Sequence, residues 1–283
     1  TGKGDALLTR LKTEGRNSPA DVLITTDAGR LYRAHEAGVL QAVDSSLLAK
    51  AVPAHLRSDN NEWFGLSVRA RAIVYARDRV DPEMLSSYEA LAEPRWKGRI
   101  CIRSSSNIYN QSLVASMLAA HGEKATDVWL RALVANFARP PQGGDRDQIT
   151  AVAAGQCDIA VVNSYYYGAM LQAQDAQRTA AEKVAIFWPN QGGRGTHINV
   201  SGAGVTASAR NVVAAVGLLE FLVGDESQRW YAETNNEYPL RDNIPVSDLL
   251  MSWGEFKADQ LDVTELGRRN ADAVKAMDRA GWK

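Results

Sequence analysis

Apolar and polar positions follow two different periods along the first part of the chain, and each period predicts a different element. Residues 5–11 carry apolar side chains on one helical face behind an acidic first turn, which favours an amphipathic helix. Residues 21–25 form a short apolar and β-branched run after Pro19 and predict a buried strand. A second helix is expected over residues 28–37, ending at Gly38, because glycine adopts the left-handed conformation that stops a helix.

The same alternation continues in the middle of the chain. We expect strands at 100–102 and 159–162, with helices between them at 108–120, 124–136 and 145–154. Both strands are apolar on both faces, as a sheet covered by helices requires, and helical connections favour parallel pairing through crossovers. The sequence therefore predicts an α/β fold with doubly wound sheets.

Two long segments, 67–76 and 197–206, contain β-branched residues without helical spacing. We interpret both as strands that cross between two α/β lobes. Two such crossings form a hinge, and open α/β sheets bind ligands at the carboxyl ends of their strands. A ligand cleft between the two lobes is therefore expected.

Composition narrows the functional classes. The 283 residues are 45% hydrophobic and 23% charged, with a net charge of −1, so the chain has no broad basic field and nucleic acid is not an expected partner. No apolar run approaches the roughly 18 to 20 residues that span a bilayer. The first residues show no signal-peptide pattern, and we expect the signal peptide not to be present in this chain.

Sequence motifs for catalysis are not found. The chain has no GxSxG elbow, no GxxxxGK[ST] loop, no HExxH and no CxxC pair, and its four histidines are scattered. Cys101 and Cys157 have no metal-ligand spacing; we favour two small core residues, with a disulfide between neighbouring strands as the alternative. We therefore do not expect an enzyme.

Tyrosines stand out at the ends of two predicted strands. Tyr165, Tyr166 and Tyr167 follow the strand at 159–162 directly, and three adjacent tyrosines are hard to bury together because each hydroxyl needs a partner. One interpretation is structural: the three tyrosine rings would pack together at the edge of a lobe. The functional interpretation is that their hydroxyls gather at the cleft.

A fourth tyrosine, Tyr109, lies just inside the helix that opens after Arg103 with three serines and Asn107. Serine and asparagine at a helix start cap free backbone amides, and the same amides can form an anion pocket. A capped helix is ordinary without a ligand, so this pattern alone leaves both interpretations open.

Taken together, these segments resemble the ferric-iron-binding proteins of bacterial ABC importers, nearest to their tyrosine-rich, cyanobacterial-type branch. The likeness covers almost the whole chain and is carried by 27–29 (DAG), 63–66 (WFGL), 69–71 (RAR), 103–112 (RSSSNIYNQS), 145–148 (DRDQ), 155–158 (GQCD), 163–167 (NSYYY) and 199–204 (NVSGAG).

The resemblance implies a role for particular residues. Tyr109, Tyr165 and Tyr166 would be phenolate ligands of Fe(III), and Tyr167 a neighbour. Arg69 would balance charge or hold a synergistic anion such as carbonate, and Ser106 with Asn107 would hold an anion or water. Fe(III) is a hard cation that prefers anionic oxygen, so phenolates suit it. Binding must expel phenol protons, and affinity should fall in acid.

The resemblance also implies a two-lobed periplasmic-binding-protein fold, type II-like, with two crossing hinge strands. Lobe 1 would comprise 1–71 with 197–246, and lobe 2 would comprise 72–196 with 247–283. Relatives open with a further strand carrying a tyrosine, which lobe 1 would lack here. The implied protein is a periplasmic monomer that delivers iron to a permease in the inner membrane.

Two alternatives stay open at this stage. The same fold could hold a small anion or organic solute through Arg69, Arg103 and the helix start at 104–107. A transferase or sugar-modifying α/β enzyme would instead need an acid and base pair. The carboxylates nearest the motifs are those of Asp145, Asp147 and Asp158, for which we expect roles in helix capping and turns.

Overall fold

The computed structural model describes residue 2 and residues 4–283, which divide into two compact units. Unit 1 comprises Thr1–Val68, Asn199–Ser247 and Leu261–Arg268, and unit 2 comprises Arg69–Ile198, Asp248–Gln260 and Arg269–Lys283. Two of the passages between the units lie inside strands β2 (Phe64–Ala76) and β6 (Ile198–Val205), the segments that the sequence predicts to cross.

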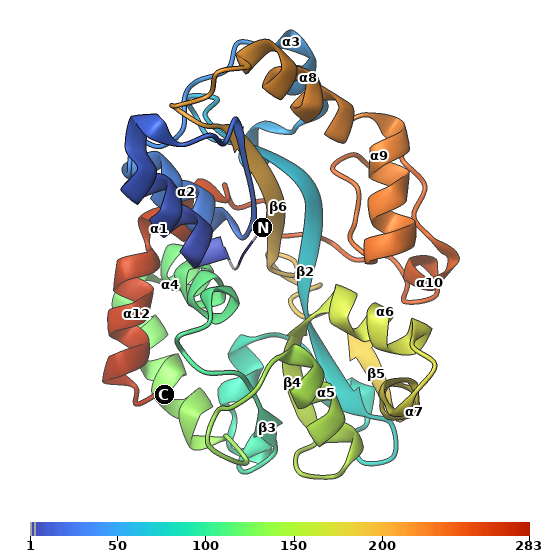
Figure 1. Cartoon of the computed structure of the whole chain (residues 1–283). Coiled ribbons are helices and arrows are strands. Elements are labelled where there is room, and N and C mark those ends of the chain that lie inside the picture. Colours follow the sequence, from blue (N-terminus) through green and yellow to red (C-terminus); the bar gives the residue numbers. More distant parts are fainter. Residues whose placement is uncertain (1, 3) are drawn as a thin grey trace. The chain divides into compact units, whose positions relative to one another are not determined.

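Unit 1 contains β1 (Val22–Thr26), most of β6 and the first part of β2 (Figure 1). β1 pairs antiparallel with β6, with Val22 opposite Val205. Its helices are α1 (Gly4–Glu14), η1 (Gly15–Asn17), α2 (Ala28–Glu36), α3 (Ser46–Ala51), η2 (Ala54–Leu56), α8 (Val212–Leu222), α9 (Asp225–Trp230), the π-helix η6 (Tyr231–Asn235) and α11 (Thr264–Arg268).

Local chemistry accounts for the ends of α2. The Oδ1 atom of Asp27 accepts a hydrogen bond of 2.9 Å from the amide of Gly29, and Asn199 Oδ1 accepts one of 2.7 Å from the amide of Ala28. Both bonds satisfy amides that a helix start leaves without partners. Gly38 follows the helix with φ of 61°, the left-handed conformation predicted for it.

Unit 2 is built on a mixed sheet in which β2 lies between β4 (Ile159–Asn163) and β5 (Val184–Phe187). β2 runs antiparallel to both, and β4 pairs parallel with β3 (Ile100–Cys101). The predicted α/β class is confirmed. The parallel pairing expected for the strands at 100–102 and 159–162 is found between β3 and β4. β2, which the sequence predicted only as a crossing strand, enters this sheet from unit 1.

The helices of unit 2 follow the predicted periodicity. α4 (Ile108–Ala135) spans both helices predicted over 108–136, and Gly122 inside it has a non-helical φ of 74°, which separates the two parts. The others are η3 (Pro82–Met84), η4 (Glu89–Ala92), η5 (Pro94–Trp96), α5 (Asp145–Ala153), α6 (Ser164–Gln172), α7 (Ala176–Glu182), α10 (Asp248–Met251) and α12 (Asn270–Arg279).

Cys101 and Cys157 form a disulfide bond with an S–S distance of 2.08 Å. The favoured interpretation of two unlinked core residues is therefore wrong, and the alternative is what the structure shows. Both residues are buried, and the bond joins the last residue of β3 to the turn before β4.

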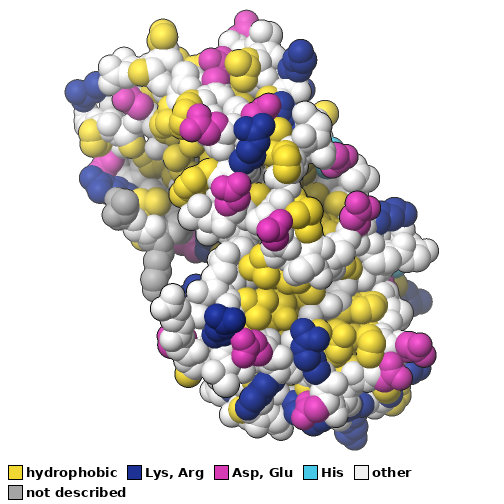
Figure 2. Space-filling view, turned by 90° about the vertical axis from the view of Figure 1, so that its right-hand side faces the viewer, with side chains coloured by type: hydrophobic (Ala, Val, Ile, Leu, Met, Phe, Trp, Pro, Cys, Tyr) yellow, Lys and Arg dark blue, Asp and Glu magenta, His cyan; other side chains and the backbone are white. Residues whose placement is uncertain are grey.

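Surface charge and hydropathy agree with the composition. Figure 2 shows basic and acidic side chains intermingled over the face that it presents, so that face has no field of one sign. Among residues 2 and 4–283, no helix has both the length and the apolar character needed to cross a membrane.

Candidate metal centre

Three predicted tyrosines come together in unit 2. Tyr109 projects from the first turn of α4, and Tyr165 and Tyr166 project from the first turn of α6. The hydroxyl of Tyr165 donates to that of Tyr109 over 3.4 Å, and the rings of Tyr165 and Tyr166 lie 4.3 Å apart between centroids. They meet because β3 and β4 are parallel neighbours, so the segments that follow them leave the same edge of the sheet.

Tyr167 faces the other way. Its hydroxyl donates to the carbonyl oxygen of Val184 at 3.2 Å, its ring packs 5.4 Å from that of Trp253, and only 3% of its surface is exposed. Successive residues of a helix are turned by about 100°, so a run of three covers too wide an arc to serve one site. The run therefore divides between the site and the core.

Four arginines surround the tyrosine rings. The guanidinium carbon of Arg69 lies 5.2 Å from the ring centroid of Tyr109 and 5.7 Å from that of Tyr165. The same measure is 5.5 Å for Arg103 over Tyr109, 6.0 Å for Arg71 over Tyr109 and 5.7 Å for Arg146 over Tyr166. This positive surrounding favours anions, whether phenolates or a bound solute.

Burial keeps the phenols protonated without a cation. Burial raises the pKa of Tyr165 well above 10, and the charge of Arg69 lowers that pKa in part. Burial also raises the pKa of Tyr166, and the neighbouring Tyr109 adds to the rise. The arrangement is suited to a strongly charged cation, which can displace the protons by stabilising the phenolates.

The start of α4 is capped as predicted. Asn107 Oδ1 accepts a 3.1 Å hydrogen bond from the amide of Tyr109, and Ser104 Oγ accepts one of 3.2 Å from the amide of Ser106. The hydroxyl of Ser106 is exposed and lies 3.0 Å from that of Ser104. Ser106 and Asn107 thus sit beside the tyrosines, and their role toward an anion stays a prediction.

The structure contains a buried ionic network beneath the tyrosines that the sequence did not predict. Arg71 and Asp145 have side chains only 2% and 0% exposed, and Arg71 Nη1 lies 2.8 Å from Asp145 Oδ2. Arg103 Nη1 lies 3.1 Å from Asp145 Oδ1. The available signal was the pair Arg69 and Arg71, two residues apart in an apolar strand. Such a pair shares one face, and a buried charge requires a partner.

The other carboxylates considered for acid and base chemistry have structural partners. Asp147 Oδ2 accepts a 2.6 Å hydrogen bond from the amide of Gly144 at the start of α5, which is the predicted capping role. Asp158 lies 2.9 Å from Arg79 and 2.5 Å from Arg99. Asp145 sits in the first turn of α5, but its carboxylate is engaged in the ionic network.

Other metals prefer histidine, cysteine or carboxylate ligands. Among the residues that the structure describes, no three His, Cys, Asp or Glu side chains form a cluster that could hold a metal ion. Of the histidines, His197 is buried; burial and then the charge of Arg194 hold its pKa well below 6.5, so its ring is neutral at physiological pH.

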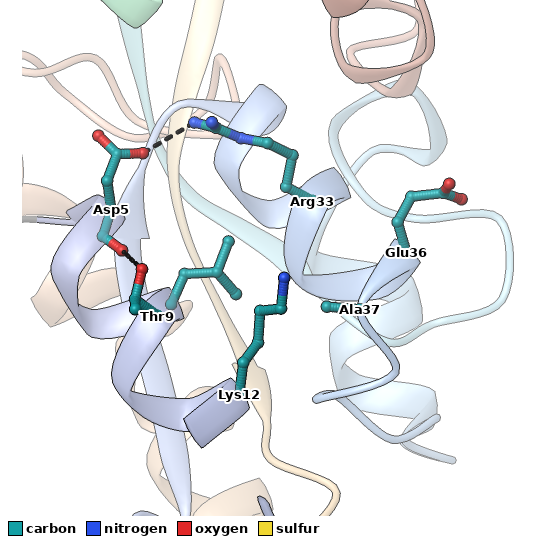
Figure 3. A pocket seen from close by; sticks show the side chains of 7 residues that line it. Asp5, Thr9, Lys12, Arg33, Glu36 and Ala37 are labelled. Atoms are coloured by element: carbon teal, nitrogen blue, oxygen red, sulfur yellow. Dashed lines mark hydrogen bonds and ion pairs between the residues drawn. The ribbon is translucent and has the colours of Figure 1, made fainter. Parts of the chain in front are cut away.

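A cavity also lies in unit 1. A cavity of about 390 Å³ between α1 and α2 is lined by Asp5, Leu8, Thr9, Lys12, Arg33, Glu36 and Ala37 (Figure 3). The carboxylate of Asp5, which lines this cavity, pairs with Arg33 at 2.9 Å and with Arg30 at 3.0 Å. Both cavity helices belong to unit 1, whereas the tyrosines belong to unit 2.

Comparison with known proteins places the chain among binding proteins. The family of bacterial extracellular solute-binding proteins matches residues 17–258. The chain is 52% identical to iron uptake protein A1 of Synechocystis sp. (strain ATCC 27184 / PCC 6803 / Kazusa), over 100% of this chain and 79% of that protein. It is 49% identical to iron uptake protein A2 of the same organism, over 99% of this chain and 82% of that protein.

Solved structures give the same picture. Trichodesmium FutA (IdiA), in complex with iron and citrate ligands, has a TM-score of 0.97 and 52% identity, covering 100% of this chain and 90% of that one. Apo FutA2 from Synechocystis PCC6803 has a TM-score of 0.96 and 48% identity, covering the same shares.

Proposed function

Because this chain belongs to the bacterial extracellular solute-binding proteins, we propose that it binds Fe(III) through tyrosine phenolates and delivers the ion to an ABC permease for iron uptake. The proposed ligands are Tyr109, Tyr165 and Tyr166. The observation that carries the proposal is the meeting of these phenols at the ends of two parallel strands, with Tyr165 and Tyr109 hydroxyls 3.4 Å apart.

The chemistry of the ligands supports a ferric cargo. Fe(III) prefers hard anionic oxygen donors, and three phenolates carry a charge that offsets a 3+ ion. The relatives named for iron uptake and the FutA structure with iron and citrate support the same cargo for this chain.

A synergistic anion fits the positive charge that gathers around the tyrosines. Arg69, Arg103 and Arg146 lie over the tyrosine rings, and Arg103 also pairs with Asp145. A carbonate or carboxylate ligand would complete the coordination of iron beside these guanidinium groups and the start of α4, where we place Ser106 and Asn107.

Loading and release should be coupled to protons. Burial holds the phenols of Tyr165 and Tyr166 in the neutral form, so iron must displace a proton from each phenol it binds. Affinity therefore falls as the pH falls, by up to about tenfold per pH unit for each proton displaced.

The role is transport without a chemical step. The family is extracellular, and we place this chain in the periplasm as a monomer that passes its ion to the permease in the inner membrane. The carboxylates near the site support this view, because Asp147 and Asp158 are held by structural partners.

A titration of the metal-free protein with ferric citrate at neutral pH tests the proposal. We expect a saturable one-to-one complex with a visible phenolate-to-iron charge-transfer band. Tyr165→Phe combined with Tyr166→Phe should weaken binding by roughly a hundredfold or more, since losing even an indirect partner of a ligand costs roughly ten- to hundredfold. Tyr167→Phe is the matched control, because its hydroxyl bonds to Val184 in the core.

Two results would contradict the proposal. A double variant with the affinity of the wild type would remove these tyrosines from the ligand set. No coloured complex, together with submicromolar calorimetric binding of phosphate, carbonate or a small carboxylate without metal, would favour the anion-binding alternative built on Arg69 and Arg103.

A further inference from the structure

The carboxylate of Asp145 joins several elements beneath the tyrosines. It lies 2.8 Å from Arg71 of β2 and 3.1 Å from Arg103, which follows β3. Its Oδ2 atom also accepts a 2.7 Å hydrogen bond from the amide of Asn163, the last residue of β4. A fully buried carboxylate that is shared in this way fixes the elements that hold its donors.

Arg71 extends the connection to the residues beside the tyrosines. Its Nη2 atom donates to Asn110 Oδ1 at 2.6 Å, and its Nη1 atom donates to Asn163 Oδ1 at 3.2 Å. Asn110 directly follows Tyr109, and Asn163 precedes Tyr165 by two residues. One planar guanidinium therefore spans the start of α4, which carries Tyr109, and the end of β4, which directly precedes the helix that carries Tyr165 and Tyr166.

The side-chain amide of Asn110 holds the loop that leads from β3 to α4. Its Nδ2 atom donates to the carbonyl oxygen atoms of Arg103 and Ser104 at 3.0 Å and 3.2 Å. These bonds hold the loop from β3 to α4 against the same helix start. The group formed by Arg71, Asn110, Asp145 and Asn163 is called the brace below.

We propose that the brace is a set of positioning residues, which sets the iron affinity by holding Tyr109 in register with Tyr165 and Tyr166 without touching the ion. The inference rests on the proposed function. Metal ligands must be held to within roughly 0.5 Å of the productive geometry, and the groups that support ligands govern affinity and electronic structure. The brace connects the start of α4 with the end of β4, and so joins the two segments that carry the ligands.

The chain supplies a matched control at the other end of β4. Asp158, like Asp145, lies between two arginines, at 2.9 Å from Arg79 and 2.5 Å from Arg99. This cluster precedes β4, whereas the tyrosines follow it. Asp158→Asn therefore disturbs a carboxylate held between two arginines just before the same strand, at the end away from the tyrosines.

The experiment uses two brace variants and this control. Arg71→Lys keeps the charge but removes the fork that spans two partners. Asn110→Ala removes the acceptor of Arg71 Nη2 and the two bonds to the loop before α4, while leaving the pair of Arg71 with Asp145 intact. Each protein is titrated with ferric iron in competition with citrate, the charge-transfer band is recorded, and urea unfolding of the metal-free protein gives its stability.

We expect both brace variants to bind iron roughly ten- to hundredfold more weakly and to shift the charge-transfer maximum, because phenolate geometry at the iron changes. Asp158→Asn should stay within about twofold of the wild type with an unshifted band, even where its loss of stability is equal. If Arg71→Lys does not fold, Asn110→Ala decides the question.

Unchanged affinity and an unshifted band in the folded brace variants would overturn the inference and leave the iron proposal standing. An effect of Asp158→Asn equal to theirs would overturn it as well, since the loss would then follow stability. A wild-type protein without a charge-transfer band would overturn both proposals together.

Discussion

Removing the disulfide between Cys101 and Cys157 should cost unit 2 several kcal/mol. The two cysteines are 56 residues apart in sequence, so the bond closes a long loop in the unfolded chain. For a loop of this length the chain-entropy relation gives about 14 cal/mol/K, which is about 4 kcal/mol at 25 °C. Both residues lie in the core, so Cys→Ala substitutions add a smaller loss of packing.

Comparison of single and double variants separates these two contributions. Cys101→Ala alone already opens the loop, so it should show most of the loss, and adding Cys157→Ala should cost only about 1 kcal/mol more for packing. The assay is urea unfolding followed by tryptophan fluorescence. Five of the seven tryptophans belong to unit 2, namely Trp96, Trp129, Trp188, Trp253 and Trp282, so the signal reports mainly on this unit.

A total loss below about 1 kcal/mol for the double variant, with an unchanged dependence on urea, would refute the reasoning. The unfolded chain would then be as constrained without the bond as with it. A loss confined to the second substitution would also refute it, because packing and not loop closure would be the cause.

Two further predictions concern pH and packing. Because burial holds the pKa of His197 well below 6.5, the unfolded chain takes up a proton below that pH that the folded chain does not. The free energy of unfolding is therefore full above pH 6.5 and falls by up to about 1.4 kcal/mol per pH unit toward the folded pKa. Urea unfolding at pH 8 and pH 5.5 should show a smaller loss of stability between the two pH values in His197→Gln than in the wild type, and equal losses would disprove this. In unit 1, a Cβ on Gly267 would lie 2.2 Å from Cβ of Tyr32, so Gly267→Ala should cost roughly 1–3 kcal/mol or more in thermal unfolding. Gly217→Ala in α8 meets nothing within 4 Å and should stabilise by up to about 1 kcal/mol; equal effects of the two would exclude the clash.

Elements with strong local signals were predicted well from the sequence. The periodicity of 108–136 predicts two helices, and the structure shows one element interrupted at Gly122, where the positive φ breaks the helical path. The tyrosine cluster also followed from local order, since residues directly after neighbouring parallel strands leave the same sheet edge.

Features that depend on distant pairing could not be predicted in the same way. The orientation of β2 and the pairing of Cys101 with Cys157 depend on which strands become neighbours, and no local pattern carries that information. The contacts of Asp145 could not be predicted for the same reason. Its position at a helix start predicts a cap, and only the fold brings Arg71, 74 residues away, into contact with it.

The opposite orientations of Tyr166 and Tyr167 have a consequence for insertions and deletions. The boundary between the proposed solute site and a hydrophobic core passes between two identical, adjacent side chains. Deleting Ser164 would shift the run by one place, presenting Tyr166 and Tyr167 where Tyr165 and Tyr166 now stand. The site would keep its pair of phenols, while Gly168 would leave the volume beside Trp253 unfilled. In this segment the core is less tolerant of a change in length than the proposed ligand set.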